Sequence, residues 1–443
     1  MKSSANTYYA AGSAAESRVQ PPFSFFRVAL LYGMGFVGFH ILLTLVFLSG
    51  LMGVSRTFTT PFRLAFLLGS SLIFLTGVIN RKIESRHFVL VFVFGFWLLY
   101  LARIIYAYIA ETSLGTPVLD YFLKTYGIIV IPSLAFLIPL SERENRGARA
   151  ILLLSVFAAA FCLLGGYWDY MEIYSYRSIQ YQGVDTYYLI SPHTLSEIGA
   201  LLTLLCLYFL LVPREKQKII FPLSIVGVFL GFFLMLWGAS RYAFLSLVCV
   251  LPILLFYSRY KIKPIVAIFM TLGACCFIAL ALYGAAHFAG NKLLMRFLLL
   301  YDQVQAGELA AGSGRLAMWS SGWHQFLDNP LFGSGLEEKT NRYLVHQRYL
   351  EGFMSTGFLG GTMLLISTVY GVRVALRVLK VCPQFGWLSL LYMYRFFAGW
   401  AGQHIFDPIF WYSFMALMAI YLANDVSNKV KQRSSTGVAA DYA

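Results

Sequence analysis

Long apolar runs separated by short polar segments fill most of the chain from about residue 28 onward. Many of these runs are close to 20 residues long, and an α-helix of that length crosses about 30 Å of hydrocarbon. The pattern predicts twelve membrane-spanning helices at 28–50, 64–79, 88–110, 126–140, 150–166, 195–212, 219–238, 242–258, 264–286, 352–372, 385–403 and 406–423. We therefore expect an all-α polytopic membrane protein.

Composition supports the same class. The 443 residues are 59% hydrophobic and only 12% charged, whereas about a quarter of the residues of a typical soluble domain are charged. So few charges cannot cover the surface of a soluble globule of this length. A soluble enzyme, a fibrous protein and a disordered protein are all excluded.

The net charge of +14 comes from 34 Lys and Arg against 20 Asp and Glu, and most of these cations follow the spans. Seven segments on one face, namely the two termini and alternate connections, hold three cations each, so 21 of the 34 lie there. They are Lys2, Arg18 and Arg27; Arg81, Lys82 and Arg86; Arg143, Arg146 and Arg149; Arg214, Lys216 and Lys218; Arg259, Lys261 and Lys263; Arg373, Arg377 and Lys380; Lys429, Lys431 and Arg433. Because cytoplasmic connections are enriched in Lys and Arg, we expect both termini in the cytoplasm. The membrane topology thus accounts for the positive net charge. The charge therefore gives no support to nucleic-acid binding.

The opposite face carries two long segments that are rich in aromatic residues, which predicts folded structure with short helices at the membrane surface. The expected organisation is a cytoplasmic segment 1–27, spans one to nine over 28–286 with a periplasmic loop 167–194, a large periplasmic loop 287–351, spans ten to twelve over 352–423, and a cytoplasmic tail 424–443.

Several arginines are not explained by the topology. Arg395 falls near the middle of a span, where a charge is costly, so we expect it to face the bundle interior. Arg241 follows Ser240 at the external end of a span, where an anchoring role is equally easy to explain. Arg177 lies in the first long loop, whose aromatic residues suit either sugar stacking or a membrane-interface belt.

The second long loop contains a predicted short helix from about Ser313 to Asp328, which ends at Asn329-Pro330. Arg315 lies in its first turn, where the helix dipole disfavours a cation unless an anion is bound nearby. The apolar stripe of this helix is explained by packing on the membrane domain.

Further along the loop, Arg342 and His346 are four residues apart. If this stretch is helical they share a face, and the cation would lower the pKa of the imidazole and make it a plausible general base. An ordinary interfacial histidine remains the alternative.

Three marks in order give a resemblance to a known family. A span ends in Ser240-Arg241; a long external loop carries Gly314-Arg315, Trp319 and the stretch 329–335; and His346 opens a His-x-x-Tyr-Leu stretch that ends at Gly357 and Gly360. Over about 225–365 the sequence resembles the bacterial O-antigen ligase/polymerase superfamily, the Wzy_C-type membrane glycosyltransferases. It departs from the family pattern at Gln347, where Asn is common, and at Tyr242, where a small residue is common.

The resemblance implies a GT-C-like protein of the bacterial inner membrane that works at the periplasmic face. The donor would be a glycan on undecaprenyl pyrophosphate, and the acceptor would be another lipid-linked glycan or lipid A–core. His346 would activate the acceptor hydroxyl together with Arg315 as catalytic residues. Substrate binding would fall to Ser240 and the arginines, because guanidinium groups suit phosphate oxygens: Arg177, Arg241, Arg342 and Arg348.

No Asp-x-Asp motif and no GxxxxGK[ST] loop is present, so we expect inverting transfer without metal, ATP or another cofactor. A polymerase is the favoured reading because two external loops suit two lipid-linked glycans, and a ligase is the alternative within the family. A lipid-linked oligosaccharide flippase or other transporter, and a purely structural membrane protein, remain open. The sequence does not reveal whether a chain-length regulator binds.

Overall fold

The computed structural model describes residues 25–37, 56–80, 87–110, 114–168, 192–211, 220–238, 240–257, 315–340 and 342–435, and every regular element within these ranges is helical. The elements are α2 (Phe25–Val28), η1 (Ala29–Met34), α4 (Arg56–Ile79), α5 (Phe88–Ile109), α6 (Val118–Phe122), η2 (Leu123–Val130), α7 (Ile131–Leu134), η3 (Ala135–Leu137), α8 (Glu142–Trp168), α9 (Pro192–Leu211), α10 (Ile220–Gly238), α11 (Arg241–Tyr257), α14 (Arg315–Asp328), α15 (Arg348–Val381), η4 (Pro383–Phe385), α16 (Gly386–Ala401) and α17 (Pro408–Ser435). The predicted all-α class is confirmed for this part of the chain.

Five helical stretches in the described ranges are long and apolar enough to cross a membrane: Pro61–Ile79, Phe88–Ile109, Val118–Leu137, His193–Leu211 and Arg348–Val381. Shorter apolar helices are found at Phe25–Val37, Phe221–Met235, Arg241–Tyr257 and Pro408–Asn424. These stretches overlap spans expected from the sequence. The expected spans 150–166 and 385–403 correspond to α8 and α16, which are helical but are not among these stretches. The expected span 264–286 lies outside the described residues, so the total of twelve and the GT-C-like plan stay predictions.

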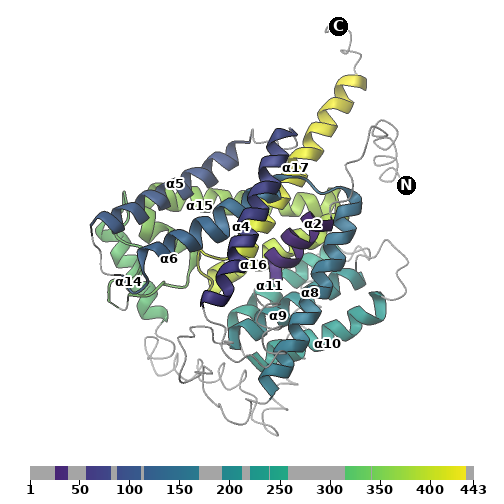
Figure 1. Ribbon diagram of the computed structural model, residues 1–443, viewed down its shortest axis with the longest axis horizontal. Helices are drawn as coiled ribbons and strands as arrows, with labels where there is room; N and C mark the ends of the chain where they lie inside the picture. Colours follow the sequence, from purple (N-terminus) through teal and green to yellow (C-terminus); the bar gives the residue numbers. More distant parts are fainter. Residues whose placement is uncertain are drawn as a thin grey trace.

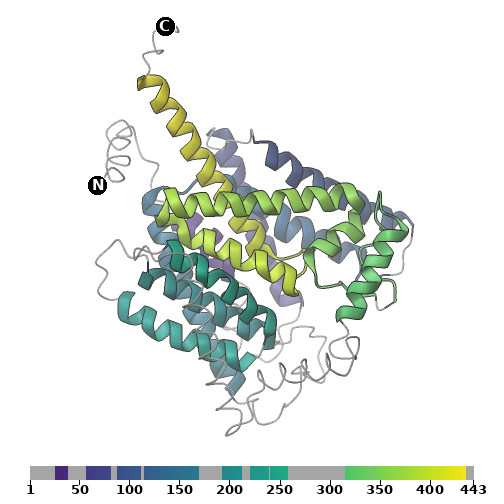
Figure 2. The ribbon, with the colours of Figure 1, turned by 180° about the vertical axis from the view of Figure 1, so that it is seen from behind.

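The helices form two groups that meet at α16 (Figure 1). In one group α9 packs along α10, and the contact is close because Gly199 and Gly231 face each other without side chains. In the other group α15 packs against α5 and α16, and α14 lies at the far end (Figure 2). Helix α11 joins the groups through its contact with α16. The candidate residues at the ends of α9, α11, α15 and α16 are therefore brought to a common region.

A capping box begins α8 at the end predicted to be cytoplasmic. The backbone N–H of Glu144 donates to the Ser141 hydroxyl (3.3 Å), and the Glu144 carboxylate accepts from the backbone N–H of Ser141 (3.0 Å). Arg27 forms an ion pair with the same carboxylate (3.2 Å). This buried carboxylate fastens the first described helix to α8.

Helix α15 is interrupted at Gly357, whose φ of 69° lies in the left-handed region. The backbone N–H of Phe358 donates to the Pro330 carbonyl (2.6 Å), and that of Ser334 donates to the Met354 carbonyl (2.8 Å). The segment after α14 is thus bonded to α15 on both sides of the break. The break allows residues 330–334 to pack against α15.

Replacing Gly357 with Ala should destabilise the protein by at least about 1–3 kcal/mol, because the backbone conformation disfavours a side chain. The new Cβ would also collide with the Leu331 carbonyl. Thermal unfolding in detergent measures the effect. Gly127→Ala is the matched control, since a Cβ there meets nothing within 4 Å. Equal melting temperatures for the two variants would contradict this account.

Candidate active site

A buried carboxylate fixes the non-helical segment between α14 and α15. Glu337 accepts hydrogen bonds from the backbone N–H groups of Gly115 (2.6 Å) and Thr116 (3.0 Å) and from the Tyr121 hydroxyl (2.6 Å). A buried carboxylate needs such donors, because an unpaired charge there is costly. The segment is therefore held against the connection before α6 by tertiary contacts.

Arg342 and His346 both lie in this segment with positive φ angles, 53° and 56° respectively. Helix α15 begins only at Arg348, and the side chain of Gln347 caps it by accepting from the backbone N–H of Leu350 (2.5 Å). The predicted helical i,i+4 pair of Arg342 and His346 is therefore wrong, since a left-handed residue before the cap stops the helix. The expectation that Arg342 lowers the pKa of the His346 imidazole assumed this shared helix face, so it loses its geometric basis.

The backbone of His346 is held by Glu351 in the first turn of α15. One carboxylate oxygen accepts from the backbone N–H of His346 (2.8 Å), and the other accepts from that of Ile405 (2.8 Å). Glu351 is buried. One side chain thus ties the His346 segment to the connection between α16 and α17.

These elements enclose a cavity of about 450 Å³. Its polar lining comes from the start of α9, the start of α11, the His346 segment, the end of α16 and the connection 402–407. The polar lining residues used below are His193, Thr194, Glu197, Tyr242, His346, Arg395, Gln403, His404 and Asp407. A concave site with converging polar groups is the usual form of a small-ligand or catalytic site.

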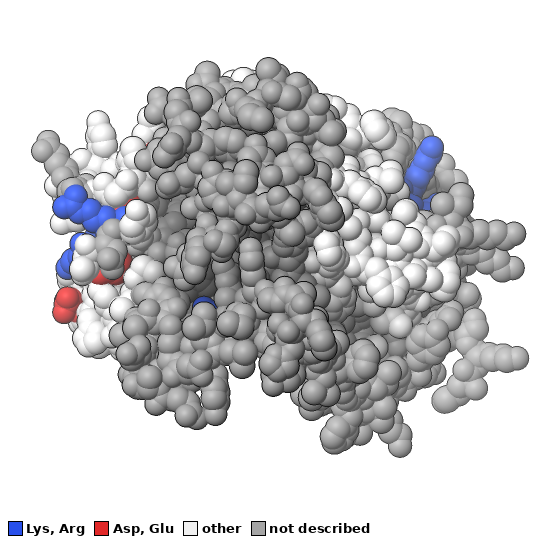
Figure 3. Space-filling view, turned by 90° about the horizontal axis from the view of Figure 1, so that it is seen from below, with Lys and Arg blue, Asp and Glu red and all other residues white. Residues whose placement is uncertain are grey.

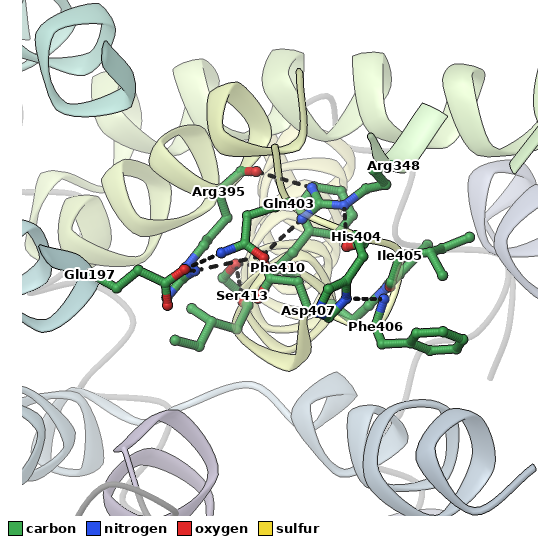
Figure 4. A network of polar contacts seen from close by, with 12 residues as sticks. Glu197, Arg348, Arg395, Gln403, His404, Ile405, Phe406, Asp407, Phe410 and Ser413 are labelled. Carbon is green, nitrogen blue, oxygen red and sulfur yellow. Dashed lines mark hydrogen bonds and ion pairs between the residues drawn. The ribbon is translucent and has the colours of Figure 1, made fainter. Parts of the chain in front are cut away.

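A buried ion-pair network forms one wall of the cavity (Figure 4). Arg395, which is 3% exposed, pairs with Glu197 (3.4 Å) and lies 3.9 Å from Asp407, and Arg348 pairs with Asp407 (2.8 Å). The prediction that Arg395 faces the bundle interior is confirmed. Two guanidinium groups and two carboxylates balance one another, as buried charges require.

Glu197 receives two further hydrogen bonds, from the Tyr242 hydroxyl and the Gln403 amide, and Gln403 also donates to the Tyr242 oxygen (3.1 Å). Tyr242 is one of the positions where the sequence departs from the resembled family. Here its hydroxyl fills a place in the network that a small residue would leave open.

Arg348 is fully buried and its donors are used within the protein. It donates to Asp407, to the Arg395 carbonyl (3.0 Å) and to the His404 carbonyl (3.4 Å). Its guanidinium also stacks 3.9 Å above the Phe410 ring. These bonds shape the 402–407 connection around the start of α17.

His404 faces His346, with 5.9 Å between the ring centroids. Nδ1 of His404 accepts from the backbone N–H of Phe406 (3.1 Å), so the neutral ring carries its hydrogen on Nε2. Burial, with the nearby positive charge of a protonated His346, lowers the pKa of His404 to about 3. His404 therefore remains a neutral hydrogen-bond donor at physiological pH.

Ser240 and Arg241 lie at the start of α11, beside the cavity. The buried Ser240 hydroxyl is 3.1 Å from Nδ1 of His193, and its backbone N–H donates to Ser196 (3.1 Å). Ser240 thus positions a lining residue, and Arg241 is brought to the same side of the site.

Residues 226–365 match the Wzy_C family model, described as O-antigen ligase. This stretch is similar to the Wzy_C domain. No curated protein matches it. The protein is a multi-pass membrane protein in which less than half of the chain matches this family.

The Wzy_C match contains Ser240, Arg241, Tyr242 and the whole His346 segment, but only part of the cavity. His193 and Glu197 precede the match, and the stretch 395–407 follows it. The site is therefore built jointly by the Wzy_C domain and by helices on both sides of it.

The remaining predicted residues are less central in the described structure. Arg342 is exposed and does not appear in the cavity lining. The described charged side chains seen in Figure 3 lie mainly at the end near α14. Arg315 is the first residue of α14, and only its backbone is described. Arg177 lies outside the described residues.

The sequence reasoning missed His193, Glu197, His404 and Asp407. A signal was present for the last two, because Gln403-His404-Ile405-Phe406-Asp407-Pro408 is a polar group in a short external connection between apolar spans. Asp followed by Pro is also a common helix start. Glu197 carried a weaker signal, as a lone carboxylate near the end of a span.

Proposed function

We propose that the protein transfers a glycan from undecaprenyl pyrophosphate to an acceptor hydroxyl at the periplasmic face of the bacterial inner membrane. The observation that carries the proposal is His346, which belongs to the Wzy_C match, lines a polar cavity, and is held there through its backbone by Glu351. The acceptor is a second lipid-linked glycan, which makes the protein a polymerase.

In the proposed reaction the acceptor oxygen attacks the anomeric carbon of the donor. The new glycosidic bond forms as the bond from that carbon to the phosphate oxygen breaks. His346 takes the hydroxyl proton, and undecaprenyl pyrophosphate leaves with the bonding electrons. A single displacement on an α-linked donor inverts the anomeric centre. General base catalysis of this kind requires an imidazole with a free lone pair.

The developing charge on the pyrophosphate needs cations. We assign this role to Arg241 at the start of α11 and to Arg315 in the first turn of α14, with a contribution from Arg177 and Arg342. Arginine side chains supply the charge in this scheme, so chelators should leave the rate unchanged.

Arg348 takes a different role from the one its sequence context suggested. Since its guanidinium is buried against Asp407, we assign it to holding the 402–407 connection. Ser240 likewise acts through His193 and does not contact the phosphates.

Glycan profiling tests the proposed function. A deletion strain is complemented with wild type, and lipopolysaccharide and lipid-linked glycans are separated. A single repeat unit on lipid A–core in the deletion strain supports the polymerase. Bare core with long chains on undecaprenyl pyrophosphate indicates a ligase, and lipid-linked units retained in the cytoplasmic leaflet indicate a flippase. A normal glycan profile in the deletion strain would refute the proposal.

A further inference from the structure

We propose that the cavity lined by Glu197, Gln403 and His404 is a saccharide subsite that binds an uncharged sugar of the acceptor glycan, with the pyrophosphate held outside it. This inference rests on the proposed function and names the substrate class of one part of its site. The inference rests on one observation: the charge-balanced ion-pair network that includes Arg395, Glu197 and Asp407 lines the same cavity as the candidate base His346.

The charges of the cavity wall exclude a pyrophosphate. Arg395 is the only Lys or Arg side chain in the described lining, and it is paired with Glu197 and close to Asp407. Arg348, behind the wall, is paired with Asp407. A pyrophosphate carries negative charge on both phosphates, and placing it beside two carboxylates would be strongly unfavourable in a buried site.

The polar groups of the lining suit sugar hydroxyls. Carboxylate oxygens of Glu197 and Asp407 accept hydrogen bonds, the Gln403 amide both donates and accepts, and the neutral His404 ring donates from Nε2. Phe36 and Phe406 add aromatic surface to the lining. A volume of about 450 Å³ falls within the usual range for small-ligand sites.

The sugar belongs to the acceptor because His346 lines the same cavity. The hydroxyl that loses its proton must lie within hydrogen-bond reach of the base. The donor sugar adjoins the pyrophosphate, which the cavity charges exclude. The ion-pair network therefore favours binding of the acceptor sugar, whose hydroxyl is the nucleophile, over binding of the donor sugar.

Glu197→Gln tests the assignment, because a saccharide subsite and a pyrophosphate site predict different effects on acceptor binding and on inhibition by pyrophosphate. Removing this carboxylate should raise the KM for the acceptor about tenfold, as expected for loss of a charged hydrogen-bond acceptor. Inhibition by inorganic pyrophosphate should change less than about twofold. At a pyrophosphate site, the same substitution would remove a repulsive charge and make inhibition much tighter.

A second variant fills the cavity without touching the ion pairs. Thr194 lines it from the start of α9, so Thr194→Trp should also raise the acceptor KM while leaving pyrophosphate inhibition and the donor KM near wild type. Glu144→Gln, in the capping box of α8, is the matched control for loss of a buried carboxylate and should leave both constants unchanged.

The assay uses the full-length protein in nanodiscs with lipid-linked repeat units purified from the host strain, the donor being labelled and the acceptor being varied. An unchanged acceptor KM in both cavity variants, or pyrophosphate inhibition tightened about tenfold in Glu197→Gln, would overturn the saccharide assignment. Absence of glycan transfer by the wild type would instead refute the proposed function.

Discussion

His346→Ala should lower the turnover number for glycan transfer by roughly 10²–10⁴-fold, the usual contribution of a general base. The imidazole lines the cavity, and the backbone of His346 is anchored by Glu351, so loss of the side chain leaves this backbone hydrogen bond in place. Amounts of protein and melting temperatures should therefore match wild type. Steady-state rates with purified protein in nanodiscs measure the effect, and a variant with wild-type turnover would remove His346 from the mechanism.

The pH dependence separates His346 from its neighbour His404. A base works only when unprotonated, so the wild-type rate should decline as the pH falls. The pKa of His404 is lowered to about 3, so its protonation cannot cause a decline near neutral pH. His404→Asn, which keeps an acceptor near the position of Nδ1, should retain the decline, whereas the residual activity of His346→Ala should lack it. Loss of the decline in His404→Asn would contradict the assignment.

Arg348→Met should destabilise the protein by about 3–5 kcal/mol, because removing one partner of a buried ion pair leaves the other charge uncompensated. Arg348 is fully buried, and among the described residues Asp407 would keep Arg395 as its cationic partner, whose closest nitrogen lies 3.9 Å away. Thermal unfolding in detergent should show a lowered melting temperature. Arg348→Lys should also lower the melting temperature, because an ammonium group cannot replace the planar guanidinium that donates to three acceptors.

The double variant Arg348→Met/Asp407→Asn provides the control. Asn at 407 keeps an oxygen that can accept from the backbone N–H of Phe410 (3.3 Å in the present structure), so the cap of α17 survives while the charge is lost. The double variant should therefore be more stable than the sum of the two single effects predicts. If Arg348 served mainly to bind pyrophosphate, Arg348→Met would instead lower activity with little effect on stability.

The fold class followed from the sequence because apolar length and charge placement report directly on the membrane. Stretches such as Phe88–Ile109 coincide with expected spans. The interior position of Arg395 could also be predicted, since a charge in mid-span has few alternatives. The role of His346 came from the family resemblance, and its helical context was wrong, because a left-handed residue before a cap has no clear sequence signal at a non-glycine position.

The ion-pair partners could not be predicted, because they join residues far apart in the chain. Glu197 is in α9 and Arg395 in α16, and only tertiary packing brings them together. Arg348 looked like a phosphate ligand for the same reason: a lone arginine in an external loop gives no indication of the carboxylate that it meets. The position of an arginine in the sequence can indicate that it is either buried in an ion pair or used to bind substrate. Deciding between these two roles requires knowing which carboxylate or ligand the arginine contacts.

The carboxylate of Glu351 has a mechanical consequence. Its two oxygens hold the backbone amides of His346 and Ile405, so neither loop can shift far without breaking one bond or dragging the other loop with it. The two imidazoles on these loops should therefore respond jointly to whatever enters between them. A ligand that displaces the 402–407 loop would also move His346 relative to the acceptor hydroxyl. Binding of a ligand at the 402–407 loop would therefore alter proton transfer at His346.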